Sequence, residues 1–495
     1  RSWAMNYSVW QIVSAVLYIM NMGLAVYIAG TMILRKQDPV KTLSWAIVLV
    51  ALPYIGIIIY LFFGQNYRKK KIYGKKGDAD LRVRKSLCAK QNEYLSDNYD
   101  DIDTNEWGYV KLLRQNLNVG YYPVEFNKSI DFFFTGRDAL DAIYSSIEGA
   151  KRYVHLQFYI IENDRTGAKF KDLLVKKARS GVEVRIIYDG LGSYALKRKF
   201  AEELRSAGVE VLVFSPVRLL LPTFTLNYRN HRKIVVVDGK EGFIGGVNIA
   251  DRYYYGTESG DWHDTHIKIV GDAVTSLQSC FLQDRYFILN KNLKRKRYFP
   301  PKLEMKEPVE MQDTIISQTI VSGPDSFWSG IMLCYLGVIS QATHHIYIVS
   351  PYFTPSETIL NAIKIAALGG VDVRIMLPEA SDSRITHWST MSYVQELLDA
   401  GVRIYLFGEG FNHSKVVTVD GKMAIVGSAN MDMRSFEHNF EIMSLIYNEK
   451  CAMEVESQFE KDITLCKLVT NTKWKKRPVG EKVKESFGRL WSPLL

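Results

Sequence analysis

The chain contains Asn230-His-Arg-Lys-Ile-Val-Val-Val-Asp238 and, further on, a closely similar stretch, Asn412-His-Ser-Lys-Val-Val-Thr-Val-Asp420. Both match the pattern His-x-Lys-x-x-x-x-Asp, and all four residues between the Lys and the Asp are β-branched in each. The matching residues are His231, Lys233, Asp238, His413, Lys415 and Asp420. Because β-branched runs favour strands, each stretch predicts a buried strand with polar residues at its start.

The similarity extends upstream of both stretches. Residues 180–189 and 207–214 each combine a small turn with a hydrophobic run, and residues 370–377 and 400–407 repeat this order. Such runs alternate with amphipathic helical stretches, which is typical of an α/β fold with a layered sheet. We predict two similar α/β/α sandwich halves, residues 109–300 and 301–495, packed pseudo-symmetrically around a site at their interface.

The repeat also exposes an insertion in the first half. The spacing from Gly208 to His231 is 23 positions, against 12 from Gly401 to His413, so the first half holds 11 extra residues. They lie around residues 216–226 and are mostly apolar, which is unusual for a loop in water. We hypothesise that this segment enters a bilayer beside the site, with Arg218 at the level of the headgroups. A loop buried against the other half is the alternative.

The spacing within each motif has a chemical meaning. Residues i and i+2 of a strand face the same side, so each motif sets an imidazole beside an ammonium group. Each motif is followed by small residues and an Asn, in Gly245-Gly-Val-Asn248 and Gly427-Ser-Ala-Asn430. Two lysines and two Asn amides can clamp one phosphodiester and stabilise a five-coordinate transition state without a metal or another cofactor. Turn chemistry is the alternative role for Asn248 and Asn430.

Two histidines allow a division of roles. One imidazole must be neutral to attack phosphorus and the other protonated to release an alkoxide, and the unperturbed pKa of about 6.5 permits both. A carboxylate on the far ring nitrogen would set the tautomer and strengthen the nucleophile, and Asp264 and Glu441 are the candidates. Asp238 and Asp420 stay among the site candidates. Each lies an odd number of positions from its His and Lys and so faces the other side of the strand, which favours a structural role.

The N-terminal region predicts membrane insertion. Val9 to Leu34 and Thr42 to Phe63 carry no charged residue, and roughly 20 apolar residues suffice to cross a bilayer. We predict a hairpin of two transmembrane helices, about 9–34 and 42–63, within residues 1–65. A pair of buried core helices is the alternative.

Residues 66–108 predict a linker that is basic at first and then acidic. Its basic part favours a cytoplasmic location for the domain that follows, although the short hairpin loop is basic as well. The formal charge of +10 and the pI near 9.0 favour an anionic partner, which can be nucleic acid, anionic lipid or a phosphate-bearing substrate. Basic clusters at 291–297 and 473–477 fit a membrane surface or a solvated face. Five scattered cysteines indicate no structural zinc site.

At these motifs the chain resembles the phospholipase D superfamily and, within it, the bacterial cardiolipin synthases. The resemblance rests on residues 227–239, 242–249, 349–356 and 427–436. It implies an enzyme that transfers a phosphatidyl group between two phosphatidylglycerol molecules through a covalent histidine intermediate, giving cardiolipin and glycerol. His231 would be the nucleophile and His413 the acid and base.

The resemblance also implies roles for the neighbouring residues. Lys233, Lys415, Asn248 and Asn430 match the phosphate-binding positions of the superfamily. Ser428 keeps a serine that is common beside them, whereas Gly246 departs from it. The expected partners are phosphatidylglycerol and anionic membrane lipids, not nucleic acid, and a homo-oligomer is left open. The expected location is the bacterial inner membrane, with the catalytic domain in the cytoplasm.

Three rival functions remain at this stage. A hydrolytic phospholipase D, or another phosphatidyltransferase of the superfamily, would use the same chemistry with a different acceptor. A nuclease would suit a basic chain, although the hairpin and the apolar insertion argue against it. A membrane scaffold with a decayed site is disfavoured because all six motif residues are present.

Overall fold

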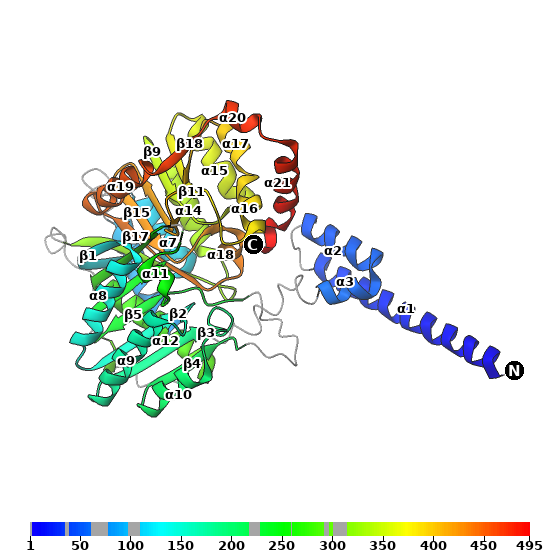
Figure 1. Ribbon diagram of the computed structural model, residues 1–495, viewed down its shortest axis with the longest axis horizontal. Helices are drawn as coiled ribbons and strands as arrows, with labels where there is room; N and C mark the ends of the chain where they lie inside the picture. Colours follow the sequence, from blue (N-terminus) through cyan, green and yellow to red (C-terminus); the bar gives the residue numbers. More distant parts are fainter. Residues whose placement is uncertain are drawn as a thin grey trace. The chain divides into compact units, whose positions relative to one another are not determined.

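The computed structural model describes residues 2–34, 39–60, 78–97, 109–216, 228–258, 260–291, 297–299 and 314–495. The chain divides into two compact units, a small N-terminal unit of helices and a much larger unit that holds both motifs. Figure 1 shows the helices of the first and the large sheet of the second. The apolar insertion, Arg218 included, and most of the 291–297 cluster lie outside the described residues, as does the expected boundary between the halves.

The N-terminal unit consists of α1 (Ser2–Leu34), α2 (Pro39–Ala51) and α3 (Pro53–Ile59). Within the described residues, Trp10–Leu34 of α1 is the one helix long and apolar enough to cross a membrane. The prediction of a continuous second span over 42–63 is not confirmed, because the helix breaks at Leu52 and restarts at Pro53. Proline lacks the N–H that the preceding turn would bind and clashes with its carbonyl groups, which ends α2 there.

One mixed sheet runs through the large unit and joins its two halves. The first half contributes, in sheet order, β1 (Glu125–Thr135), β7 (Trp262–Gly271), β6 (Glu241–Gly245), β5 (Ile234–Val237), β2 (Tyr153–Phe158), β3 (Glu183–Asp189) and β4 (Glu210–Phe214). The second contributes β8 (Ile315–Ser322), β17 (Glu441–Tyr447), β15 (Met423–Gly427), β14 (Val416–Val419), β9 (His345–Val349), β11 (Asp372–Pro378), β12 (Arg403–Phe407) and the edge strand β18 (Cys466–Val469). The halves meet where β1 and β8 pair antiparallel, with Glu125 opposite Ser317. Apart from β18, the two halves repeat one strand order.

Helices cover both faces of this sheet. In the first half α8 (Gly136–Gly149), α9 (Arg165–Arg179) and α10 (Arg198–Ser206) lie on one face and α12 (Ala273–Leu289) on the other. The alternation along β2 shows the division, since Val154 and Leu156 join the core under α8–α10 while His155 stacks on Phe281 of α12. Side chains of a strand point alternately to opposite faces, and all six residues of β2 are buried because helices cover both faces.

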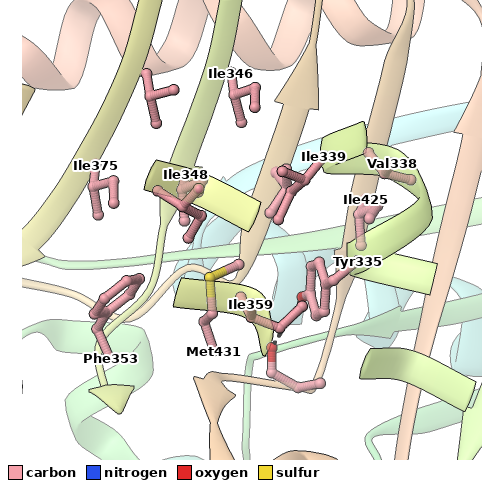
Figure 2. Close-up of a cluster of buried hydrophobic side chains, with 14 of the residues drawn as sticks. Tyr335, Val338, Ile339, Ile346, Ile348, Phe353, Ile359, Ile375, Ile425 and Met431 are labelled. Carbon is pink, nitrogen blue, oxygen red and sulfur yellow. Dashed lines mark hydrogen bonds between the residues drawn. The ribbon is translucent and has the colours of Figure 1, made fainter. Parts of the chain in front are cut away.

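The second half has the same layers. Its helices are α14 (Gly330–Gln341), α15 (Glu357–Leu368), α17 (Val394–Asp399) and, on the opposite face, α19 (Glu449–Ile463). Figure 2 shows its core, where Ile346 and Ile348 of β9 pack with Ile375 of β11 and with Tyr335 and Ile339 of α14. The predicted α/β fold with two similar halves is therefore confirmed.

The remaining elements frame the sheet. Helix α5 (Asp78–Asp97) falls within the expected linker and packs on α7 (Val110–Gly120), with the Gln91 amide bonded to both backbone groups of Val124. The C-terminal helices α20 (Asn471–Lys475) and α21 (Val479–Trp491) follow β18, and α21 packs on α16 (Arg384–Met391). Short elements are α11 (Asp251–Tyr255), β10 (Phe353–Thr354), β13 (Phe411–Asn412), β16 (Met431–Asp432), α18 (Met433–Glu437) and η3 (Ser492–Leu494).

Candidate active site

The two motif histidines are held by backbone pairing between the halves. His231 precedes β5, and its N–H donates to the carbonyl of Phe440, just before β17 of the second half, at 2.9 Å. In the mirror arrangement, β13 pairs parallel with β7, and the N–H of His413 donates to the carbonyl of His263 at 2.7 Å. Each histidine is therefore anchored to the strand that carries the acidic candidate of the opposite half.

This pairing brings Glu441 of the second half to His231 of the first. The Nδ1 atom of His231 lies 3.0 Å from Oε1 and 3.1 Å from Oε2 of Glu441, and 3.1 Å from the carbonyl oxygen of Ser428. All of these neighbours are acceptors, so Nδ1 must carry the proton. The lone pair of Nε2 is then free for attack on phosphorus.

Asp264 of the first half serves His413 of the second in the same way. The Nδ1 atom of His413 lies 2.7 Å from Oδ2 of Asp264. The ammonium group of Lys415 lies 2.8 Å from the same Nδ1 and also donates to the carbonyl of His413. Because an ionised carboxylate can only accept, the 2.7 Å bond to Asp264 requires the proton on Nδ1, and Lys415 donates to the carbonyl oxygen of His413.

Two buried lysines supply the positive charge of the site. Lys233 donates to the carbonyl of His231 at 2.6 Å. Burial lowers the pKa of Lys233 to about 7 and that of Lys415 to about 8. The charge of Lys415 also lowers the pKa of Lys233, and burial together with the charges of Lys415, Lys233 and His231 holds the pKa of His413 well below its usual range. The two motifs therefore act electrostatically on each other, as groups around one ligand site do.

The two orienting carboxylates differ in their surroundings. Burial raises the pKa of Glu441, but His231, Lys233 and hydrogen bonds outweigh it and lower that pKa below its usual value. The hydroxyls of Ser428 and Ser435 and the amide of Asn439 all donate to this carboxylate. Burial raises the pKa of Asp264 to about 6.

Gly246 explains part of this difference. It occupies the position in the first half that Ser428 occupies in the second, and a β-carbon there would collide with the carboxylate of Asp264. A serine fits beside Glu441, where its hydroxyl donates to the carboxylate. The departure of Gly246 from the common serine therefore makes room for the shorter acid that holds His413.

Comparisons with known proteins agree with this geometry. Residues 143–271 and 335–463 each match the family described as "Cardiolipin synthase, PLD-like domain", and residues 23–65 match "Phospholipase_D-nuclease N-terminal". A cardiolipin synthase from Geobacillus sp. (strain WCH70) is 40% identical over 472 residues, which cover 95% of this chain and 92% of the relative. The chain belongs to the cardiolipin synthase family. This membership confirms the prediction, made from the duplicated motif, of a phosphatidyltransferase of the cardiolipin synthase type.

Other relatives extend the comparison. The major cardiolipin synthase ClsA of Bacillus subtilis (strain 168) is 36% identical over 497 residues, which cover 99% of this chain and 100% of the relative. Among solved structures, phosphatidylserine synthase from Haemophilus influenzae Rd KW20 matches with a TM-score of 0.59 over 78% of this chain and 99% of that one. At 15% identity this second likeness concerns the fold alone.

The motif aspartates lie at the far ends of their strands from the histidines of this cardiolipin synthase-family site. Asp238, at φ 54°, accepts three backbone N–H groups at the start of β2. Asp420, at φ 53°, accepts the backbone N–H groups of Thr343, His344 and His345 and the hydroxyl of Thr343, all at 2.8 Å. These contacts tie the turn after the motif strand to the strand beside it and are distant from the two histidines.

The Asp420→Asn variant is expected to lose about 1–3 kcal/mol of folding free energy while its turnover per folded molecule stays within about twofold of wild type. Although burial raises the pKa of Asp420, its hydrogen bonds lower it below the usual value. The ionised carboxylate therefore contributes stability above the unfolded pKa of about 3.9, and this contribution is lost as the pH falls through the folded pKa. Denaturant unfolding at several pH values should show the gap to wild type closing below about pH 4. Unchanged stability with lost turnover would instead place Asp420 in the chemistry.

The three other phosphate-binding candidates have different environments. Asn248 is engaged by the protein, since its Oδ1 accepts from the N–H of Ile160 at 3.0 Å and its amide donates to the hydroxyl of Tyr253 at 2.7 Å. Ser428 donates to Glu441. In the described part of the chain, Oδ1 of Asn430 is buried without a hydrogen-bond partner. The unused atom of Asn430 is thus an acceptor, which suits a substrate hydroxyl and not a phosphate oxygen.

Sequence reasoning missed an aromatic residue beside each histidine. The ring of Tyr159, directly after β2, lies 4.8 Å from that of His231, and Tyr352, just after β9, lies 6.2 Å from His413. The hydroxyl of Tyr352 donates to Asp382 at 2.7 Å. Val154 lies opposite Val237 and Ile346 opposite Val419, so the repeat aligns Tyr352 with Ile160 and not with Tyr159, and it gave no signal that pairs the two tyrosines. Among the described residues, no group of three or more His, Cys, Asp or Glu is arranged to hold a metal ion.

Proposed function

We propose that this enzyme makes cardiolipin by transferring a phosphatidyl group from one phosphatidylglycerol to another through a covalent phosphatidyl-histidine on His231. The observation that carries the proposal is the reciprocal pairing of His231 with Glu441 and of His413 with Asp264 across the two halves. Each pair leaves one Nε2 atom available to the substrate. Two imidazoles prepared in this way can serve the two sides of an in-line displacement at one phosphorus.

In the first step of the reaction, Nε2 of His231 attacks phosphorus and the bond from phosphorus to the glycerol oxygen breaks. The glycerol leaves with the proton of Nε2 of His413. The new P–N bond puts positive charge on the ring of His231, and Glu441 stabilises that charge because its pKa is lowered and it stays ionised. This is the basis for choosing His231, with its better ionised partner, as the nucleophile.

In the second step of the reaction, His413 is neutral and takes the proton from a hydroxyl of the second phosphatidylglycerol. The resulting oxygen nucleophile attacks phosphorus, the P–N bond breaks, and the electron pair returns to Nε2 of His231. The products over the cycle are cardiolipin and glycerol, with all protons balanced. No step requires a metal ion, since Lys233 and Lys415 provide the positive charge.

The lysines also couple substrate binding to protonation. Their pKa values are lowered by burial to about 7 and 8. A phosphodiester anion between them favours their charged forms and raises the pKa of His413, whose neighbours otherwise hold it low. Substrate binding thus supplies His413 with the proton that the leaving glycerol needs.

The acceptor distinguishes this proposal from hydrolysis. Purified enzyme with phosphatidylglycerol vesicles is expected to release one glycerol for each cardiolipin formed, measured by lipid chromatography together with an enzymatic glycerol assay. Phosphatidic acid as the only lipid product would contradict the synthase and establish a hydrolytic phospholipase D. Plasmid DNA incubated alongside is expected to stay intact, and its cleavage would favour the nuclease.

The membrane part of the proposal follows from the N-terminal unit. Trp10–Leu34 crosses the bacterial inner membrane, and the apolar stretch 42–63 enters it as the second, broken arm of a hairpin. The excess of Lys and Arg in residues 66–85 supports a cytoplasmic catalytic domain. In this position the site acts on phosphatidylglycerol of the inner leaflet.

A further inference from the structure

Helix α21 turns its apolar residues outward, away from the protein core. Val479, Val483, Phe487, Leu490 and Trp491 are between 41% and 76% exposed. They are spaced three or four residues apart, apart from the adjacent last pair, and so form one stripe along the helix. A helix on a globular domain normally turns such a stripe towards the core.

The opposite, polar face of α21 packs on the protein instead. Gly488 is buried, and a β-carbon there would meet the backbone of Trp388 and Ser389 in α16. The hydroxyls of Ser389 and Ser492 are 2.7 Å apart, and Arg489 binds Glu396 at 2.6 Å. These contacts fix the rotation of the helix, so the apolar stripe cannot turn inward without separating α21 from α16.

Helix α21 is linked through α16 and η3 to residues beside the active site. Helix α16 begins two residues after Asp382, which binds Tyr352 beside His413. The short helix η3 that continues α21 packs on α18, whose first turn is capped by Asp432 close to Asn430. Figure 1 shows α21 and α16 on one side of the second half, with α19 on the opposite side.

Charge indicates what covers the stripe. Lys482 and Lys484 are exposed and lie on its two borders, and Lys473, Lys475 and Lys476 precede the helix. Long basic side chains at the edges of an apolar stripe can reach anionic headgroups while the stripe enters the boundary of the acyl chains. Trp491, at the end of the stripe, is of the residue type favoured at that boundary.

We propose that α21 docks the catalytic unit on an anionic bilayer surface, with its stripe in the lipid interface and the active site held against the leaflet. The proposal relies on the proposed function in one respect, that the substrate lies in a bilayer. It assigns to residues 479–491 a role separate from that of α1. The transmembrane helix keeps the chain in the membrane, whereas α21 orients the site on it.

Accessibility of a nitroxide label tests the docking directly. The full-length chain, with Cys466 replaced by Ser, receives a single label at Val483→Cys or, as matched control, at Met453→Cys on α19, which is equally 62% exposed. The other four cysteines are buried. In vesicles of equal parts phosphatidylcholine and phosphatidylserine, the label at 483 is expected to collide preferentially with oxygen and the label at 453 with a water-soluble nickel chelate.

Two results of this experiment would overturn the proposal. The first is a label at 483 that stays as accessible to nickel as the label at 453. The second is a label shielded from both reagents in vesicles and in detergent alike, which would mean that another protein chain covers the stripe. Replacing Lys482 and Lys484 by Gln is expected to reduce the oxygen preference at 483, and no change would contradict the role of charge.

Activity gives an independent readout. The Val483→Gln/Leu490→Gln variant is expected to lose about tenfold in rate on phosphatidylglycerol vesicles. On short-chain phosphatidylglycerol in detergent micelles its rate should match that of wild type. The control variant Met453→Gln should match the wild-type rate on both forms of substrate. Equal losses in both substrate forms would contradict docking. Absence of cardiolipin from the wild-type enzyme in both forms would count against the proposed function, and the label accessibility would then decide the docking alone.

Discussion

The His231→Ala variant is expected to lose at least about 10⁴-fold in turnover, because no other group in the site takes the place of its Nε2 in the P–N bond. The decisive measurement is covalent labelling with phosphatidylglycerol that carries radioactive acyl chains. The reaction is stopped with detergent at alkaline pH, since P–N bonds hydrolyse in acid. Wild-type enzyme should retain label on His231, and the variant should retain none.

The pseudo-symmetry of the halves requires a control for the opposite assignment. His413→Ala should be rescued in its first step by a phosphatidyl ester of p-nitrophenol, whose leaving group needs no proton. That variant is expected to release a burst of nitrophenol and then to accumulate labelled enzyme, because no base activates the acceptor. Label that accumulates in His231→Ala instead would reverse the roles of the two histidines.

Replacing Glu441 by Gln is expected to lower kcat by about 10² to 10⁴-fold, because an amide does not enforce the Nδ1–H tautomer of His231 or stabilise its positive ring. Glu441 and His413 lie in the same half of the chain, but the contact of Glu441 is with His231. The loss should therefore persist with the nitrophenyl ester, as expected for a defect in the nucleophile. Rescue by that ester would contradict the crossed pairing.

Asp264→Asn is the matched variant for the other pair, and it should behave in the opposite way. Its loss should disappear in the first step with the nitrophenyl ester, because Asp264 contacts His413, the proposed proton donor. Burial raises the pKa of Asp264 to about 6, so its carboxylate is protonated as the pH falls below that value. The wild-type rate on phosphatidylglycerol should accordingly fall on the acid side of about pH 6, and this limb should be missing in the variant.

Features set by one strand or by the repeat could be predicted from the sequence, whereas contacts between distant residues could not. The spacing of His231 and Lys233 is a property of one strand, and the duplication of the motif announces two equivalent halves, so both could be read from the chain. The choice of Asp264 and Glu441 as partners for the histidines also needed only the repeat. Which carboxylate meets which histidine depends on backbone pairing between residues about 150 to 210 positions apart, and no local pattern carries that.

Two further differences have specific physical causes. The charge-free stretch 42–63 has the composition of a membrane span, but Pro53 interrupts its helix. Gly246 looked like the loss of a hydroxyl, whereas the structure presents it as space for the carboxylate of Asp264. In both cases a single residue decides the local structure. Pro53 does so through its backbone and Gly246 through its lack of a side chain, and the hydropathy of the surrounding sequence shows neither effect.

The exchange of partners across the interface limits how such an enzyme can originate. A polypeptide with a single copy of the motif would be inert by itself, because its imidazole and its carboxylate would have no counterpart. Two copies related by a twofold axis would complete both pairs at once. Once the two copies are fused in one gene, each can change independently of the other. The difference between Gly246 and Ser428 is such a change, because a symmetric dimer would carry the same residue at both positions.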